Sequence, residues 1–223
     1  MTFRHEWKHE INLSDMIALR SRLRAVAQTD PHAVDGSYEV RSLYFDNLSD
    51  KALREKIDGV NNREKFRLRY YDKDTSLIHL EKKSRQNGLG TKASAELSIE
   101  ETQAIISGNY SRIAESQCPL IKELYLKMTA QQLRPKTIVD YTREPYIFPA
   151  GNVRITLDYD IRTGLRCTDF LNTECVTIPA GSPPIILEVK WDAYLPDLIR
   201  DIIQLNGRHT CAFSKYAACR IYG

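Results

Sequence analysis

The chain has 223 residues, 42% of them hydrophobic, which is enough for one compact domain with a substantial core. Its formal net charge is only +3, with 27% charged residues, which excludes a uniformly basic protein that coats nucleic acid; any basic surface must be local. Five cysteines without CxxC spacing argue against a zinc site or a disulfide framework. We predict a single domain over residues 1–223. No apolar leader or membrane-length apolar run is present, so we expect it in the cytoplasm.

The chain opens with a strand and a helix. Alternation of apolar Phe3, Trp7 and Ile11 with charged neighbours predicts a strand over residues 3–11. A helix is expected to begin near Asn12 or Ser14 and run to residue 27, with Ser14 or Asp15 as its N-cap. A strand is expected next over residues 36–47. Both of its faces mix apolar and polar residues, so the sequence does not show which face is buried. A helix over residues 48–57 follows.

The middle of the chain predicts a hairpin with strongly sided strands. In residues 61–72 and 76–85, charged and apolar side chains alternate, and residues 72–75 read as the turn between them. A mobile hairpin loop is expected over residues 86–92, before a strand over residues 91–98.

The second half continues with further helices and strands. Helices are expected over residues 98–108, 113–133 with a break near Pro119, 195–206 and 214–222, and strands over residues 136–146, 152–162 and 184–191. The strands do not follow a βαβ rhythm, which predicts an antiparallel sheet in an α+β fold.

Two strands illustrate the division into faces. In REKFRLRYY, residues 63–71, the face of Arg63, Lys65, Arg67, Arg69 and Tyr71 opposes that of Phe66, Leu68 and Tyr70. In residues 153–162, Val153, Ile155, Leu157, Tyr159 and Ile161 are expected on one face, and Arg154, Thr156, Asp158, Asp160 and Arg162 on the other. For any single strand, a solvated polar face is the simpler interpretation. Taken together, the faces carry arginine in i, i+2 pairs where Ser, Thr or Gln is usual.

The alternative is a closed antiparallel β-tunnel of about eight strands with a polar interior and a coat of helices. Its lumen would collect basic side chains from many strands: Arg4, Lys8, Lys65, Arg67, Arg69, Lys83, Lys92, Arg143, Arg154 and Lys190. The carboxylates opposite are fewer, chiefly Glu6, Glu81, Asp158 and Glu188. Like charges about 4 Å apart repel by about 4 kcal/mol at an effective dielectric constant near 20, so such a lumen favours a bound polyanion. Pairs of arginines bind phosphate through bidentate, charge-assisted hydrogen bonds.

The motifs in order resemble those of the triphosphate tunnel metalloenzymes, and among them the VTC-type polyphosphate polymerase domain and its bacterial relatives. The resemblance extends over nearly the whole chain and rests on these segments: RHEWK (4–8), SLYFDN (42–47), FRLRYYD (66–72), LEKKS (80–84), YTREPY (141–146), VRITLD (153–158), LEVK (187–190) and SKY (214–216). Arg4 departs from the ExExK pattern of hydrolytic relatives, which weakens the case for a triphosphatase.

The resemblance implies a tunnel that binds a nucleoside triphosphate with Mn²⁺ or Mg²⁺ and transfers the γ-phosphate of ATP to inorganic polyphosphate. By motif, the triphosphate and product would be bound by Lys8, Arg67, Arg69, Lys83, Lys92, Arg143, Arg154, Lys190 and Lys215. Arg67, Arg69, Arg154 and Lys190 would form the catalytic set. Glu188 would be the metal ligand and Glu6 a second one.

Other functions stay open at this stage. A tripolyphosphatase or nucleoside triphosphatase on the same tunnel is the nearest alternative, and a non-catalytic sensor of polyphosphate or nucleotide is another. Nucleic acid is a poorer ligand, because single-strand readers place aromatic and basic side chains on one platform, whereas Phe66 and Tyr70 point away from the arginines. The sequence leaves open whether a membrane partner receives the product.

Overall fold

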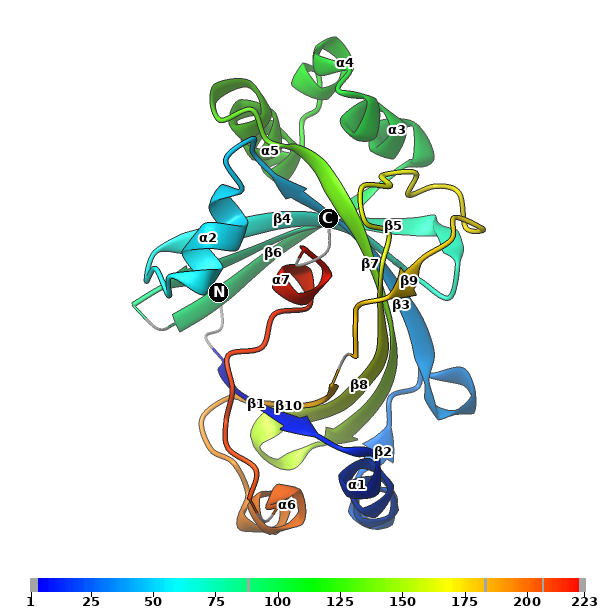
Figure 1. The fold of residues 1–223 in the computed structure, drawn as a ribbon, viewed down its shortest axis with the longest axis vertical. Coiled ribbons are helices and arrows are strands. Elements are labelled where there is room, and N and C mark those ends of the chain that lie inside the picture. Colours follow the sequence, from blue (N-terminus) through cyan, green and yellow to red (C-terminus); the bar gives the residue numbers. More distant parts are fainter. Residues whose placement is uncertain (1–3, 88, 183, 206, 221–223) are drawn as a thin grey trace.

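The computed structural model describes residues 4–87, 89–182, 184–205 and 207–220. They form a ten-stranded antiparallel sheet that curls around an open side (Figure 1). Its main path runs in the order β1 (His5–Ile11), β10 (Ile185–Trp191), β8 (Val153–Thr163), β7 (Arg134–Phe148), β3 (Tyr38–Asp46), β4 (Arg63–Tyr71), β5 (Asp74–Gln86) and β6 (Leu89–Leu97). Two short strands extend it, β2 (Gln28–Thr29) beside β7 and β9 (Ile178–Pro179) beside β8.

Helices cover both ends of the outer surface, and α7 (Lys215–Arg220) lies on the inner surface (Figure 1). The outer helices are α1 (Leu13–Val26), α3 (Ile99–Ser107), α4 (Tyr110–Ala114), α5 (Pro119–Ala130) and α6 (Asp197–Ile203). The helix α2 (Lys51–Ile57) packs through Ala52 and Leu53 on the same inner cluster as α7, and two 3₁₀ turns are η1 (Val34–Gly36) and η2 (Ala150–Asn152). None of the helices in the described ranges has the length and apolar character that a membrane crossing would need.

The apolar strand faces form two cores under the outer helices. Phe66, Leu68 and Leu80 of β4 and β5 pack with α3 to α5, whereas Ile155 and Val189 of β8 and β10 pack with α1 and α6. Each such side chain contributes about 1.5–3 kcal/mol when fully buried, so the cores fix which face of each strand points outward. The charged side chains are left on the opposite, concave face, as the alternation predicted.

An ion pair between distant strands shows that the sheet curls strongly. Glu6 Oε2 on β1 lies 3.0 Å from Lys83 Nζ on β5, although β10, β8, β7, β3 and β4 separate these strands in the sheet order. The charged faces therefore converge. The predicted closure into a tunnel is not confirmed, however, because among the described residues β1 and β6 are edges that do not pair with each other. The described fold is an open, curled half-barrel.

One strand departs from strict alternation. The β7–β8 register shifts between Asp140 and Thr142, and Asp160 has a φ of +48°, which marks a bulge in β8. Beyond the bulge the faces exchange, so Ile161 packs on the concave side with α7 and not with Val153. The prediction that residues 153–162 keep one alternation throughout was wrong for this reason.

Local details also differ from the predictions. The N-cap of α1 is Asn12, and Asp15 is its capping-box partner, because the side chain of Asn12 accepts a hydrogen bond from the Asp15 amide. The loop expected over residues 86–92 is much shorter, since Arg85 pairs with Gly90 and Gln86 with Leu89. Pro119 does separate two helices, as expected, and it starts α5. The predicted ends at Phe3 and at residues 221–222 lie outside the described residues.

Candidate functional site: the charged concave face

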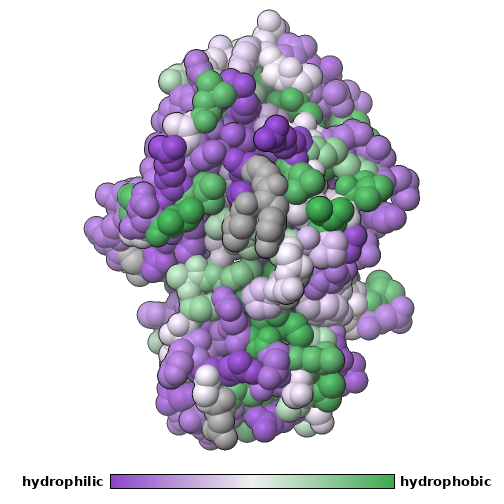
Figure 2. Space-filling model, in the orientation of Figure 1, coloured by the Kyte–Doolittle hydropathy of each residue, from purple (hydrophilic) through white to green (hydrophobic). Residues whose placement is uncertain are grey.

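Charged residues are common on the outside as well, and most of the surface in Figure 2 is hydrophilic, interrupted by smaller hydrophobic patches. Charge alone therefore does not identify a site. The concave face differs because its charged groups are buried together. Glu81, Glu188 and Asp158 have exposed fractions of 2%, 5% and 0%, and each lies among several cations.

The first cluster surrounds Glu81 on β5. Arg67 on β4 approaches its Oε2 atom with NH2 at 2.6 Å and donates from Nε at 2.7 Å, and Arg69 NH1 lies 3.7 Å away. Lys92 of β6 contacts the other carboxylate oxygen. Burial alone would raise the pKa of Glu81, but these three cations outweigh it and hold the pKa well below its usual range. The carboxylate is thus ionised and acts as a fixed partner that aligns the basic groups.

Hydroxyl groups of two tyrosines and a serine fix the two arginines from the other side. Arg67 donates to the Tyr44 hydroxyl at 2.8 Å, and Arg69 donates to Ser42 Oγ at 3.0 Å and to the Tyr141 hydroxyl at 3.1 Å. Arg67 is thus oriented by a neighbour on β3, and Arg69 by neighbours on β3 and β7. Preorganised donors of this kind bind phosphate oxygens without a further ordering cost.

The second cluster joins β1, β10 and β5 around Glu6. Its carboxylate lies 3.0 Å from Lys8 Nζ, 3.0 Å from Lys83 Nζ and 3.9 Å from Lys190 Nζ. Burial and the nearby Glu188 raise the pKa of Glu6, yet the lysines dominate and lower it to about 2. Burial lowers the pKa of Lys190 to about 8, although Glu188 and Glu6 oppose this. The cluster is therefore crowded with charges of both signs.

The third cluster is centred on Asp158 of β8. Arg143 of β7 donates from Nε and NH2 to its two oxygens, both at 2.7 Å, and Lys215 of α7 donates to Oδ2 at 2.6 Å. Against the opposing effect of burial, Arg143 and Lys215 lower the pKa of Asp158 to about 2. Glu188 lies beside this group, 3.7 Å from Arg143 NH2 and 2.6 Å from Lys190 Nζ. A helix and three strands thus meet at one ionic network.

Arg154 stands at the rim, with a side chain that is 40% exposed. Its NH2 group donates to Asp30 Oδ2 at 2.9 Å and to the Tyr38 hydroxyl at 3.0 Å, while its buried Nε has no hydrogen-bond partner in the described chain. Arg4, in contrast, was expected in the lumen but lies against Asp192 at 2.8 Å and the carbonyl of Asn152, outside the three clusters.

The structure therefore gathers the predicted basic residues on one face. The three clusters and their rim contain every predicted substrate-binding and catalytic residue: Lys8, Arg67, Arg69, Lys83, Lys92, Arg143, Arg154, Lys190 and Lys215. The predicted metal ligands Glu6 and Glu188 lie among them. What each residue binds remains a prediction.

The two predicted metal ligands have the donor chemistry that Mn²⁺ or Mg²⁺ requires. Both carboxylates lie beside the same amine, with Lys190 Nζ 3.9 Å from Glu6 and 2.6 Å from Glu188, so the two acids are neighbours. Mg²⁺ is commonly held by one or two carboxylates together with substrate phosphates. Among the described residues no group of three or more His, Cys, Asp or Glu side chains is poised to hold a metal alone. Two neighbouring carboxylates are thus available to the predicted metal, whose binding stays a prediction.

Several members of this network were not predicted as site residues. Tyr38, Ser42 and Tyr44 share one face of β3 at spacings of four and two residues, and Tyr141 lies on the neighbouring strand β7, in register with Val40. The spacing was visible in the sequence, but apolar residues on both faces of β3 hid its orientation. Asp30 lies in a loop and carried no sequence signal.

The lowered carboxylate pKa values predict acid sensitivity. A carboxyl whose pKa is lower in the folded state stabilises the fold above its unfolded value of about 4, and this stabilisation is lost as the pH falls. For Glu6 and Asp158 the loss extends down to about pH 2. The thermal unfolding temperature should therefore fall steadily below about pH 4. A constant unfolding temperature over that range in a calorimetric pH series would contradict ionised buried carboxylates.

Comparison with a solved structure agrees with this fold. A putative adenylate cyclase from Bacillus halodurans superposes with a TM-score of 0.54 at 12% identity, covering 91% of this chain and 88% of that chain. The PH1012 protein from Pyrococcus horikoshii OT3 gives a TM-score of 0.47 at 14% identity, covering 90% of this chain and 85% of that one. No curated protein matches by sequence. The VTC domain family matches residues 3–221. The chain therefore belongs to the VTC domain family, as the motifs suggested.

Proposed function

We propose that this protein is a metal-dependent polyphosphate polymerase that transfers the γ-phosphate of ATP to a growing polyphosphate chain and releases ADP. The observation that carries the proposal is the convergence of basic side chains from seven sheet strands and α7 on one concave face, where they outnumber the carboxylates. Membership of the VTC domain family supports a phosphate-related ligand. Closure of the concave face into a tunnel is part of the proposal.

In the proposed reaction, an oxygen of the terminal phosphate of the acceptor chain attacks the γ-phosphorus of ATP. The bond between that phosphorus and the β,γ-bridging oxygen breaks, and its electron pair leaves with ADP. A terminal phosphate is already anionic at neutral pH, so the step needs no general base from the protein. Phosphoryl transfer depends mainly on positioning and on charge stabilisation.

The chain's own residues would divide this work by position. Arg67 and Arg69, held by Glu81 and by hydroxyl groups, offer their remaining N–H donors to non-bridging oxygens. Arg143 and Lys215 occupy the centre and Arg154 the rim. Glu188 and Glu6 would hold Mn²⁺ or Mg²⁺, which supplies charge neutralisation of the phosphates when bound.

The direct test is incubation of the purified protein with ATP and Mn²⁺ or Mg²⁺, with the products separated by gel electrophoresis. We expect long polyphosphate chains and stoichiometric ADP. If orthophosphate is the sole phosphate product, the protein is a triphosphatase and the polymerase proposal fails. If ATP binds without turnover with either metal, and binding survives Glu188→Ala, the protein is a sensor.

A further inference from the structure

Lys65 differs from every other basic residue of the concave clusters. It precedes Arg67 and Arg69 in the alternation of β4, while Phe66 packs into the outer core. In the described part of the chain, each predicted phosphate-binding residue has a carboxylate ion-pair partner. Lys65 has no such partner there, and its Nζ atom lies 5.3 Å from the centroid of the Tyr44 ring.

The surroundings of Lys65 are mostly cationic. Burial comes first in lowering the pKa of Lys65 to about 7, and Lys83, Arg67 and Lys8 add to this while the Tyr44 phenol opposes it. Burial would raise the pKa of Tyr44, but Arg67, Lys65 and Arg69 lower it to about 7. These neighbours come from β5, β4, β1 and β3, so cations face Lys65 from several sides.

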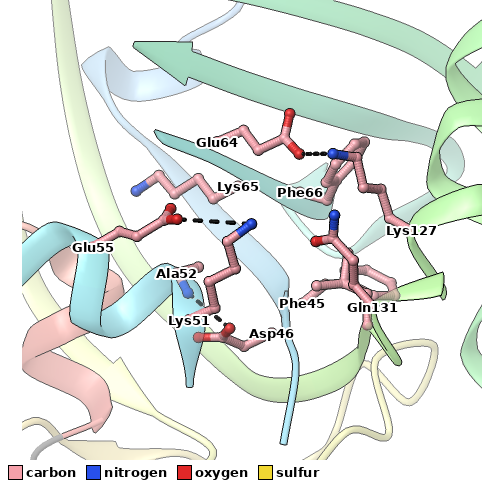
Figure 3. A pocket seen from close by; sticks show the side chains of 11 residues that line it. Phe45, Asp46, Lys51, Ala52, Glu55, Glu64, Lys65, Phe66, Lys127 and Gln131 are labelled. Atoms are coloured by element: carbon pink, nitrogen blue, oxygen red, sulfur yellow. Dashed lines mark hydrogen bonds and ion pairs between the residues drawn. The ribbon is translucent and has the colours of Figure 1, made fainter. Parts of the chain in front are cut away.

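On the side of α2, Lys65 lines a pocket with Glu55, Glu64 and Lys127 (Figure 3). The carboxylates there already have partners, since Glu55 lies 3.7 Å from Lys51 and Glu64 lies 2.9 Å from Lys82 and also contacts Lys127. Lys65 is half-buried, lies opposite Lys83 in the β4–β5 register and has no carboxylate partner in the described chain. An ammonium group held among like charges is stabilised when an anion arrives.

We propose that Lys65 is a further phosphate-binding residue of the concave face, and that it takes up a proton when a polyphosphate or nucleoside triphosphate binds. The inference rests on the proposed function for the class of ligand, and it adds a residue and a proton to that binding step. A phosphate oxygen near Nζ supplies the missing counter-ion and offsets the repulsion from Lys8, Lys83 and Arg67. The ammonium form then becomes the stable one.

The sign of the pH effect follows from this coupling. Lys65 is protonated below about pH 7 in the free protein and stays protonated to a higher pH in the complex. Affinity therefore decreases as the pH rises above about 7, because binding must then take up a proton from the solvent, and this costs more free energy at higher pH. The decrease contributed by Lys65 is at most about tenfold per pH unit. Tyr44 and the ligand's own terminal phosphate also titrate, so the effect must be read as a difference between variants.

The first measurement uses isothermal titration calorimetry with tripolyphosphate in metal-free buffer near pH 6.5. Lys65→Met is expected to weaken binding by at least about tenfold, the loss typical for one charge-assisted hydrogen bond. The control is Lys73→Met, which removes the same charge at an exposed hairpin turn where Lys73 pairs with Glu174. It should change affinity less than about twofold. Equal affinities for the two variants would overturn a phosphate contact by Lys65.

The second measurement follows affinity from about pH 7 to about pH 9 for the wild type and Lys65→Arg, whose guanidinium stays protonated throughout. The wild-type affinity should fall relative to that of the arginine variant, and the proton uptake measured in buffers of different ionisation enthalpy should be larger for the wild type. Parallel curves with equal uptake would overturn the coupling. If the wild type binds neither tripolyphosphate nor ATP, the proposed function itself fails, which distinguishes the two outcomes.

Discussion

Arg67→Ala is expected to lower the rate of polyphosphate synthesis by about 100- to 1,000-fold, the usual cost of losing one preorganised donor at a transferring group. Arg67 is held on two sides of its guanidinium, with Glu81 and Tyr44 both accepting its hydrogen bonds. The fold should survive, because Glu81 keeps Lys92 and Arg69 as partners and the repulsion between Arg67 and Lys65 disappears. The measurement is product formation from ATP together with a thermal unfolding scan.

Arg41→Ala is the matched control for this experiment. Arg41 lies on β3, next to β4, but faces outward, where it forms a two-point ion pair with Asp140 and donates to backbone carbonyls of residues 172, 173 and 175. Its loss should lower the unfolding temperature and leave the specific activity of the folded protein unchanged. If Arg67→Ala instead behaves as Arg41→Ala does, Arg67 is a structural residue.

Asp158→Asn is expected to destabilise the fold by about 3–5 kcal/mol, the range for removing one partner of a buried ion pair. The side chain is fully buried and accepts hydrogen bonds from Arg143 and Lys215. An amide leaves these two cations with less compensation and weakens the attachment of α7 to the sheet. Urea unfolding followed by circular dichroism measures the change.

Asp160→Asn serves as the comparison, since it makes the same substitution two residues along β8 at an exposed bulge position. Asp160 contacts Arg162 at 3.6 Å and is 56% exposed, so little stability should be lost. Asparagine also tolerates its positive φ. Equal unfolding free energies for the two variants would show that the buried network contributes nothing to stability.

The face of each strand could be predicted from the sequence where the side chains alternate regularly and the apolar ones pack in the core. On β4 the alternation placed Arg67 and Arg69 opposite Phe66 and Leu68, and the structure has them so. On β8 a one-residue bulge at Asp160 reversed the faces, and no composition signal distinguishes that aspartate from its neighbours. Alternation is a local property, whereas bulges depend on the partner strand.

The concave face was predictable as a set of cations but not as a network. The basic residues stand in repeated i, i+2 pairs, which the sequence displays directly. Their partners depend on how strands from distant parts of the chain align, as in the pairing of Arg154 with Asp30 or of Lys83 with Glu6. Those contacts are set by sheet order and curvature. The inner face of β3 was missed because its aromatic residues pack on α7 and thus resemble core positions.

The pairing of β1 with β10 has a consequence for the order of folding. β1 contributes Glu6 and Lys8, yet its neighbour in the sheet is the last strand of the chain to be synthesised. Bringing two such distant strands together costs loop-closure entropy before the contact gives any stability, and this slows folding. Until then Trp7, which packs edge-on against Trp191 at a centroid distance of 4.7 Å, remains without this partner. Tryptophan fluorescence during refolding should therefore report this late step, and with it the completion of the phosphate-binding face.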